Sequence, residues 1–511
     1  MIRQRVNNLY LDSNSIIYDC LRRLVPEYPK HTDCSFEDAL IATIISQIDT
    51  YIKLVSPDTQ VYIAFDGVAP VAKLQQQKIR RYKSILLQDI ERQLRQCSTQ
   101  AWDKTAITPG TAFMKKLGDR ISTHYSCIVS DGCQVLVSTS QDPGEGEHKI
   151  FHYIRCNPDK HARSVTLIYG LDADLIMLCL NHLPVCPNLF LYRETPEFIK
   201  AIRADLEPNA SYVLDIPALG RAVVQKMGGG RQSLYDYIFL CFFLGNDFMP
   251  HFPSVNIRTN GIDILLAAYR KAIAKRNKKL TDGETIHWDN VHAFVSILAA
   301  QEHHNLEEEY KIRDKWSKRF YRTDTIENKL RKLENLPTQE RAVEHCIQIH
   351  TPHWREQYYK MLFKIDIDRD YTRKICVNYL EGLEWTMRYY TTGCPDWHWK
   401  YNYHYAPLWS DLQHYIPRWS TRMIGPNCNK PVTPFLQLAY VLPGPSLSLL
   451  PEILAASLLK KYPHNYSMTQ DISWSFCKYF WESHVDFPPL DIAELNDFIT
   501  KTLQASHIQE T

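Results

Sequence analysis

The stretch LIYGLDADLIML (residues 167–178) places two carboxylates, Asp172 and Asp174, between two apolar runs. The first run predicts a buried strand and the second a helix, an alternation typical of α/β proteins. If the chain is still extended where the strand ends, the two aspartates share one face, because side chains alternate every two residues. Asp174 is also a candidate N-cap of the following helix. Ionised carboxylates beside apolar runs are costly to desolvate unless a cation meets them.

Four other segments repeat this arrangement of acidic groups beside apolar runs or in a glycine-rich turn. The full set is Asp12 after NLYL, Asp66 after VYIAF, Glu145 and Glu147 in PGEGEHK, Asp172 and Asp174, and Asp247 in FFLGNDFMPHFP. The sequence offers no matching internal cations, so we expect the seven carboxylates to share divalent metal ions. Hard oxygen ligands favour Mg²⁺ or Mn²⁺ over zinc. The alternative for any single carboxylate is a helix N-cap or an ion pair.

Strands spaced by helices predict a mostly parallel central sheet flanked by helices. The predicted strands are 8–12, 61–66, 133–139, 165–170 and 188–193, with helices over 35–55 and 71–97. Ligands bind beyond the carboxyl ends of the strands in such sheets, where three of the aspartates are expected to project. Around Glu145 and Glu147, Pro143, Gly144 and Gly146 favour a turn, with a helix beginning near His148.

The composition divides the chain of 511 residues into three parts. Residues 1–260 form the predicted α/β core, 261–350 a charged helical connection, and 351–511 an aromatic-rich region that wraps around the core. The net charge is only +2, so a nucleic-acid partner has to be held by local basic patches. RKAIAKRNKK (270–279) is such a patch or, alternatively, a solvated helix face.

The cysteines and the hydropathy pattern indicate the cellular compartment of the protein. The 14 cysteines include no CxxC pair, which excludes zinc sites built on such pairs and fits a reducing compartment. The N-terminus has no apolar signal core, and the apolar run YIFLCFFLG (237–245) is too short to span a bilayer. We therefore expect a cytoplasmic protein without a membrane partner.

A cationic helix follows the second predicted strand. In AKLQQQKIRRYKS (72–84), Lys73, Gln77, Arg80 and Arg81 fall within an arc of about 100° on one helix face. Arginine makes bidentate hydrogen bonds to phosphate oxygens, and lysine adds a point charge. Carboxylate-bound metal pairs suit phosphodiester hydrolysis, so a phosphate pocket beside them is chemically consistent. The alternative is an ordinary basic surface helix.

Together these blocks resemble the catalytic core of the Xrn-type 5′-to-3′ exoribonucleases. The matching stretches are LYLDSNSIIY, YIAFDGVAPVAKLQQQKIRRYKS, ITPGTAFMKKL, DPGEGEHKIFHYIR, YGLDADLIMLCL, FLGNDFMPHFPSVNI, GLEWTMRYYTTGCPDWHWKYNYHYAPLWSDL, PVTPFLQLAYVLPGPSLSLLP and SFCKYFWESHVDFPPLD. They follow the family's order along about the whole chain. The resemblance implies a core like that of PIN and flap nucleases.

The resemblance also implies a reaction: hydrolysis of single-stranded RNA with a 5′-monophosphate to nucleoside 5′-monophosphates, by two Mg²⁺ ions (or Mn²⁺), in RNA decay. It assigns the seven carboxylates to the metal ions and Lys73, Gln77, Arg80 and Arg81 to the 5′-phosphate. Tyr18 stands where the family has a histidine that stacks on the first base, with Trp397 or Trp399 opposite. A monomer that cooperates with decapping machinery is the implied assembly.

The sequence differs from the family pattern at its start, and two alternative functions remain. The family's usual opening segment, which runs like GVPxFFRWL, has no counterpart before Asp12, so we expect weaker duplex unwinding and a compact, virus-encoded enzyme. A flap-type nuclease acting on DNA junctions shares the acidic core but not the cationic helix or the aromatic region. A scaffold that binds 5′-phosphorylated RNA without cutting it is the other alternative, although all seven carboxylates are present here.

Overall fold

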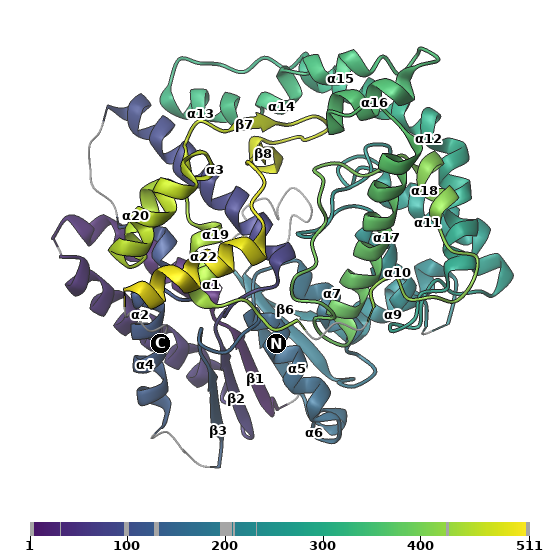
Figure 1. Ribbon diagram of the computed structural model, residues 1–511. Helices are drawn as coiled ribbons and strands as arrows, with labels where there is room; N and C mark the ends of the chain where they lie inside the picture. Colours follow the sequence, from purple (N-terminus) through teal and green to yellow (C-terminus); the bar gives the residue numbers. More distant parts are fainter. Residues whose placement is uncertain are drawn as a thin grey trace.

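A six-stranded sheet organises the first half of the chain in the computed structural model and lies in the lower part of the view in Figure 1. The structure describes residues 5–30, 32–96, 102–126, 132–194, 207, 210–230, 232–425 and 429–506. The strands are β1 Asn8–Asp12, β2 Gln60–Ala64, β3 Gln134–Ser138, β4 Thr166–Tyr169, β5 Leu189–Glu194 and β6 Ser211–Asp215, in the order β3-β2-β1-β4-β5-β6. β6 is antiparallel to β5, and the other neighbours are parallel. The predicted, mostly parallel α/β sheet is therefore confirmed.

All five predicted strands are present, each within two residues of its expected bounds. β6 lies outside them: its pattern SYVLD is only partly buried, and its place at the sheet edge depends on pairing with β5. The helices of this half are α1 Asn14–Leu24, α2 Asp33–Val55, α3 Val71–Arg95, α4 Ala112–Ser126, α5 Gly146–Cys156, α6 Pro158–Arg163, α7 Asp174–Asn181, α9 Ile216–Met227 and α10 Ser233–Phe242.

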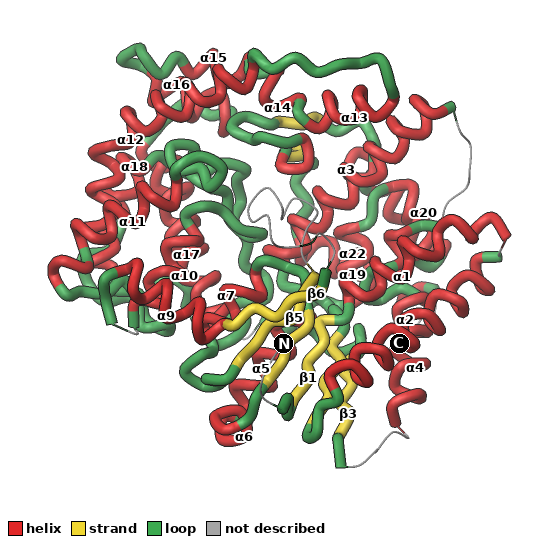
Figure 2. Tube along the Cα trace, turned by 180° about the vertical axis from the view of Figure 1, so that it is seen from behind, coloured by secondary structure: helices red, strands yellow, loops and turns green. Residues whose placement is uncertain are grey.

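Alternating side chains of β1 divide the core into two layers. Leu9 and Leu11 pack with α1, α2 and α4 on one face of the sheet, whereas Tyr10 packs with α5 and α7 on the other. Figure 2 shows the strands between these two groups of helices. Because both faces are covered there, the central strands β1, β2 and β4 are buried and mostly apolar, and the candidate metal-binding aspartates lie at or just beyond strand ends.

The second half of the chain is mainly helical and packs on the first. Its helices are α11 Gly261–Ala272, α12 Trp288–Ser317, α13 Ile326–Glu334, α14 Leu336–Gln339, α15 Ala342–Ile347, α16 Trp354–Phe363, α17 Arg369–Thr391, α18 Trp409–Tyr415, α19 Pro434–Val441, α20 Glu452–Lys461, α21 Pro463–Tyr466 and α22 Ile492–Ala505. A short hairpin pairs β7 Asp471–Ser473 with β8 His484–Asp486. Residues of α17 and α18 share one hydrophobic core with α5 and α7, so the aromatic region wraps around the α/β core as expected.

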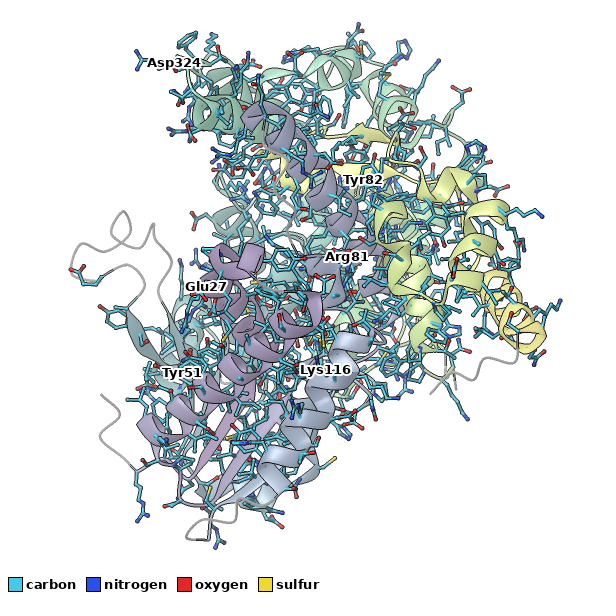
Figure 3. All side chains as sticks on the ribbon, turned by 90° about the vertical axis from the view of Figure 1, so that its left-hand side faces the viewer. Glu27, Tyr51, Arg81, Tyr82, Lys116 and Asp324 are labelled. Atoms are coloured by element: carbon cyan, nitrogen blue, oxygen red, sulfur yellow. The ribbon has the colours of Figure 1, made fainter. Side chains whose placement is uncertain are left out.

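Helix α3 links the two halves. Its first turns pack against α19, and it then rises from the core, past Arg81 and Tyr82, toward the helices near Asp324 (Figure 3). Near its end, Arg95 contacts Glu327 of α13 at 3.3 Å. Five 3₁₀ segments complete the described elements: η1 Val25–Lys30, η2 Lys104–Ala106, η3 Ala274–Arg276, η4 Gly444–Leu449 and η5 Phe480–Glu482. Among the helices described, none is both long and apolar enough to cross a membrane.

Candidate active site

Three aspartates leave the sheet at the same edge. Asp12 is the last residue of β1 and pairs in register with Ala64, two residues before Asp66. Asp172 follows β4, which is also parallel to β1. Oxygens of Asp12, Asp172 and Glu147 lie within 4.8 Å of one another. Parallel register thus brings together carboxylates that are up to 160 positions apart in the sequence.

The glycine-rich turn carries Glu145 and Glu147 into this group. The amide of Gly67 donates to Gly144 O at 2.8 Å, and the amide of Gly144 donates to Val68 O at the same distance. Gly144 has φ +103°, a conformation that glycine adopts without strain. A Cβ on Gly146 would lie 2.8 Å from Asp12 Oδ1. The turn can therefore approach the aspartates only because it lacks side chains there.

Helix α5 begins close to its expected start, whereas two expectations about Asp174 are wrong. Helix α5 begins at Gly146, two residues before His148, with Glu145 as its N-cap residue, and the amide of Gly146 donates to Asp66 Oδ1 at 2.7 Å. Asp174 is the first residue of α7, and the N-cap is Ala173, whose backbone is helical. Asp172 and Asp174 therefore do not share the face of an extended strand.

Lys73 overturns the expectation that the carboxylates have no internal cation. Its Nζ lies 2.6 Å from Glu145 Oε1 and 2.6 Å from Asp247 Oδ2. Burial alone would lower the pKa of Lys73, but Glu145 and Asp247 raise it well above its usual value. An ammonium group has three N–H donors, so one remains for a further acceptor.

One lysine does not balance seven carboxylates. Burial, followed by neighbouring carboxylates, raises the pKa of Asp12 and Glu147 well above the usual values, raises that of Asp66, and raises that of Asp174 to about 6. Burial alone would raise the pKa of Asp247, but Lys73 lowers it below its usual value. Glu147 Oε2 is buried without a hydrogen-bond partner among the described residues. An unpaired carboxylate oxygen among crowded carboxylates fits hard divalent cations such as Mg²⁺ or Mn²⁺.

Residues outside the predicted set hold the carboxylates in place. Asn14 donates from Nδ2 to Asp66 Oδ2 at 2.5 Å, and its Oδ1 accepts from the Asp66 amide at 3.1 Å. Tyr389 of α17 donates to Glu145 Oε2 at 2.8 Å and stacks on His148, with ring centroids 3.7 Å apart. Asn14 was recognisable as an amide two residues after a strand-end aspartate. Nothing local marks Tyr389, since it lies in an aromatic run.

The predicted phosphate residues lie on α3 in two environments. Arg81 donates to Gln77 Oε1 at 3.0 Å and to Thr108 Oγ1 at 2.9 Å, and burial lowers its pKa to about 10. Arg80 is exposed, and its guanidinium has no hydrogen-bond or ion-pair partner within the described part of the chain. Lys73, on the same helix, contacts two of the carboxylates. A positively charged face therefore adjoins the acidic cluster.

Of the three predicted stacking residues, one is buried. Trp399 is 8% exposed and stacks on Trp385, with ring centroids 5.2 Å apart, so it belongs to the core and is not available to a base. Trp397 is partly exposed, and its carbonyl accepts from the amide of Val71 at the start of α3. Tyr18 is 41% exposed and close enough to Arg81 to influence the pKa of its guanidinium. The structure leaves Tyr18 and Trp397 as the available rings.

Comparison with known proteins identifies the family. Residues 1–195 match the family model described as "XRN 5'-3' exonuclease N-terminus", and residues 231–350 and 322–506 match "Xrn1 helical domain". The chain is 28% identical to "5'-3' exoribonuclease 2 homolog" of Drosophila melanogaster over 95% of its length and 64% of that protein. It is 27% identical to "5'-3' exoribonuclease 2" of Arabidopsis thaliana over 87% of its length and 57% of that protein.

A third relative, "5'-3' exoribonuclease 1" of Homo sapiens, is 27% identical over 87% of this chain and 29% of that protein. The chain thus spans less than two thirds of the length of each of these three relatives. The two family models nevertheless extend over most of it, in the order of the α/β core and then the helical region. The chain therefore belongs to the XRN 5′-3′ exonuclease family.

Proposed function

We propose that this chain is a metal-dependent 5′-to-3′ exoribonuclease that removes nucleoside 5′-monophosphates from single-stranded RNA bearing a 5′-monophosphate. The main observation behind the proposal is that the cluster of seven carboxylates lies next to the cationic face of α3. Lys73 belongs to that face and contacts the cluster. Its ammonium contacts Glu145 and Asp247, and it stands on the same helix face as Gln77, Arg80 and Arg81. The names of the relatives support the same reaction class.

In the proposed reaction, a water oxygen bonds to the phosphorus between the first and second nucleotides, and the bond from that phosphorus to the 3′ oxygen breaks. The 3′ oxygen leaves as a hydroxyl after gaining a proton, and the shortened RNA keeps the 5′-phosphate. The new end is chemically the same as the old one, so the cycle repeats without any change in the site. Repeated removal from the 5′ end follows from this chemistry.

Bound divalent metal ions would supply a water activated near neutral pH and stabilise charge on the leaving oxygen. The ligands we propose are Asp12, Asp66, Glu145, Glu147, Asp172, Asp174 and Asp247, with Mg²⁺ as the resident ion and Mn²⁺ as a substitute. Neighbouring residues of the chain orient these carboxylates and control their charge. Asn14 fixes the orientation of Asp66, Tyr389 and Lys73 fix Glu145, and Lys73 keeps Asp247 ionised.

We propose that α3 selects the 5′-monophosphate. Arg80, without a partner among the described residues, and the third N–H of Lys73 are donors free for phosphate oxygens. Arg81 is held by Gln77 and Thr108, so its orientation is fixed before the ligand binds. A cap or triphosphate would exceed this pocket. Tyr18 and Trp397 would stack on the first base from opposite sides.

The decisive experiment is incubation of the chain with 5′-phosphorylated single-stranded RNA and Mg²⁺, next to 5′-hydroxyl RNA and a branched DNA junction. We expect fast release of mononucleotides from the first substrate, slow release from the 5′-hydroxyl RNA and none from the junction. Internal cuts in the junction would favour a flap-type nuclease. Tight binding of the phosphorylated RNA without products would favour a scaffold. The cytoplasmic location, the monomeric state and the link to decapping machinery belong to the same proposal and rest on cysteine usage and family resemblance alone.

A further inference from the structure

A cavity of about 780 Å³ lies on the other side of α3 from the Arg81–Thr108 contact. Its walls are α3, the loop that follows α10, the 401–405 segment and the 475–484 segment. Pockets of this size hold small organic ligands. Arg80 and Asp247 both line it, so the cavity opens directly onto the candidate active site. The proposed reaction uses these two residues but not the rest of this space.

The part of the cavity nearest the active site is suited to an anion. Arg80 reaches it with a guanidinium that no described residue engages. The cavity wall also has unmet hydrogen-bonding capacity, because Asn246 Nδ2 and His251 Nε2 are buried without partners among the described residues. Burial lowers the pKa of His251 to about 4, so the ring is neutral and does not add charge. Arg80 is therefore the cation of this wall that is free for a phosphate.

The outer rim of the cavity is suited to a nucleobase. Trp481 is 56% exposed, and its ring is nearly parallel to that of Tyr479, with centroids 6.2 Å apart. The guanidinium of Arg258 lies 5.0 Å from the Tyr479 centroid and 5.4 Å from that of Trp481. Lys83 of α3 donates to the carbonyls of Trp481 and Ser483 and so ties this rim to α3. An exposed aromatic ring held in a fixed position is a stacking platform for a base.

We propose that this cavity binds the released nucleoside 5′-monophosphate and is its way out, an inference that rests on the proposed function. A terminal nucleotide whose 5′-phosphate contacts Arg80 lies at the cavity wall when it is cut off. The remaining RNA still occupies the path by which it entered, so the product cannot return that way. The cavity offers the adjoining space, with an anion site where the 5′-phosphate lies and a base platform at the mouth.

Two positions in the cavity wall test this without touching the candidate active site. Ile257 is 61% exposed and lines the cavity, so Ile257→Glu and Ile257→Lys place opposite charges there without disturbing the core. Trp481→Ala removes the stacking ring. Trp419→Ala is the matched control, because Trp419 is 68% exposed and lies outside the cavity. The probe is adenosine 5′-monophosphate, measured by equilibrium binding without RNA or metal.

We expect Trp481→Ala to weaken AMP binding about tenfold, which corresponds to about 1.4 kcal/mol. The Ile257→Glu variant should bind AMP on the order of tenfold more weakly than Ile257→Lys at low salt, and the difference should shrink as salt is added. Trp419→Ala should bind like the unmodified chain. The KM for 5′-phosphorylated RNA should be unchanged in all four variants, because product and incoming strand use different spaces.

Two results would overturn the proposal. One is equal AMP affinity in all variants, and the other is a KM for RNA that rises by the same factor as the AMP dissociation constant, since the cavity would then hold the incoming strand. AMP binding is measured without RNA, so the two proposals fail separately. A chain that bound AMP in the cavity but cut no RNA would refute the exoribonuclease function. A chain that cut RNA with the same AMP affinity in every variant would refute the product cavity alone.

Discussion

Two lysines of α3, five residues apart, should respond oppositely to the same substitution. Lys73 is paired with two carboxylates, so removing its charge in Lys73→Met leaves the buried Glu145 and the partly exposed Asp247 without this cation. Breaking a buried pair in this way costs about 3–5 kcal/mol. The raised pKa of Lys73 means that its contribution is fully present at neutral pH and is lost only as pH rises above the usual lysine range.

Lys78 is buried without a carboxylate partner among the described residues, and burial lowers its pKa from 10.5 to about 7. At 1.36 kcal/mol per pH unit, its charge costs at most about 5 kcal/mol below pH 7, a cost that disappears as pH rises toward 10.5. Cation–π contacts with Tyr440 and Phe487, at 5.2 and 4.3 Å, return about 1–2 kcal/mol. Lys78→Met should therefore be neutral or stabilising at neutral pH.

The assay is the melting temperature of both variants at neutral pH, first in EDTA and then in Mg²⁺. We expect a lower melting temperature for Lys73→Met in EDTA and partial recovery in Mg²⁺, because added cations replace part of the missing charge. The Lys78→Met variant should melt at or above the unmodified chain, with no special response to Mg²⁺. The reasoning is refuted if Lys73→Met is as stable as the unmodified chain in EDTA, or if both variants lose the same stability.

Four further outcomes follow from the site. Asp174→Asn should abolish RNA hydrolysis in Mg²⁺ or Mn²⁺ without unfolding the chain; normal turnover in gel assays would remove Asp174 from the ligand set. In EDTA, stability should fall as pH rises from about 4 to about 6, because the raised pKa of Asp174 makes its ionisation unfavourable in the folded state; in Asp174→Asn this fall should be smaller, and an unchanged pH profile of the melting temperature would contradict the assignment. Arg81→Ala should slow cleavage of 5′-phosphate RNA by roughly 10- to 100-fold, from about 1.5–3 kcal/mol per charged hydrogen bond, with little change for 5′-hydroxyl RNA; Arg92→Ala, on the exposed end of α3, is the control, and equal slowing of both RNAs would indicate general backbone contacts. Trp399→Ala should lower stability by about 3–5 kcal/mol, whereas Trp397→Ala should weaken RNA binding by about 1–3 kcal/mol with little loss of stability; the reverse pattern in melting and binding assays would exchange their roles.

The sequence by itself determined the sheet and the acidic cluster. Hydrophobic runs such as NLYL and VYIAF predict strands from local sequence alone. In a parallel sheet, an aspartate at the end of each such strand lies at the carboxyl edge. The convergence of Asp12 and Asp172 therefore follows from local patterns and one topological rule. The α3 face follows in the same way from helical periodicity.

The tertiary structure alone decided the features that depend on packing between distant segments. The helix face predicts Lys73 as a phosphate ligand, and only its position opposite Asp247, 174 residues away, shows that it is also a cation of the cluster. Trp397 and Trp399 are indistinguishable in an aromatic run, and only the position of Trp385 makes one of them core. The cavity beside α3 likewise exists only where α3 meets the 475–484 segment. Periodicity specifies which side of its own element a residue faces, whereas the neighbour it meets there is set by how the elements pack.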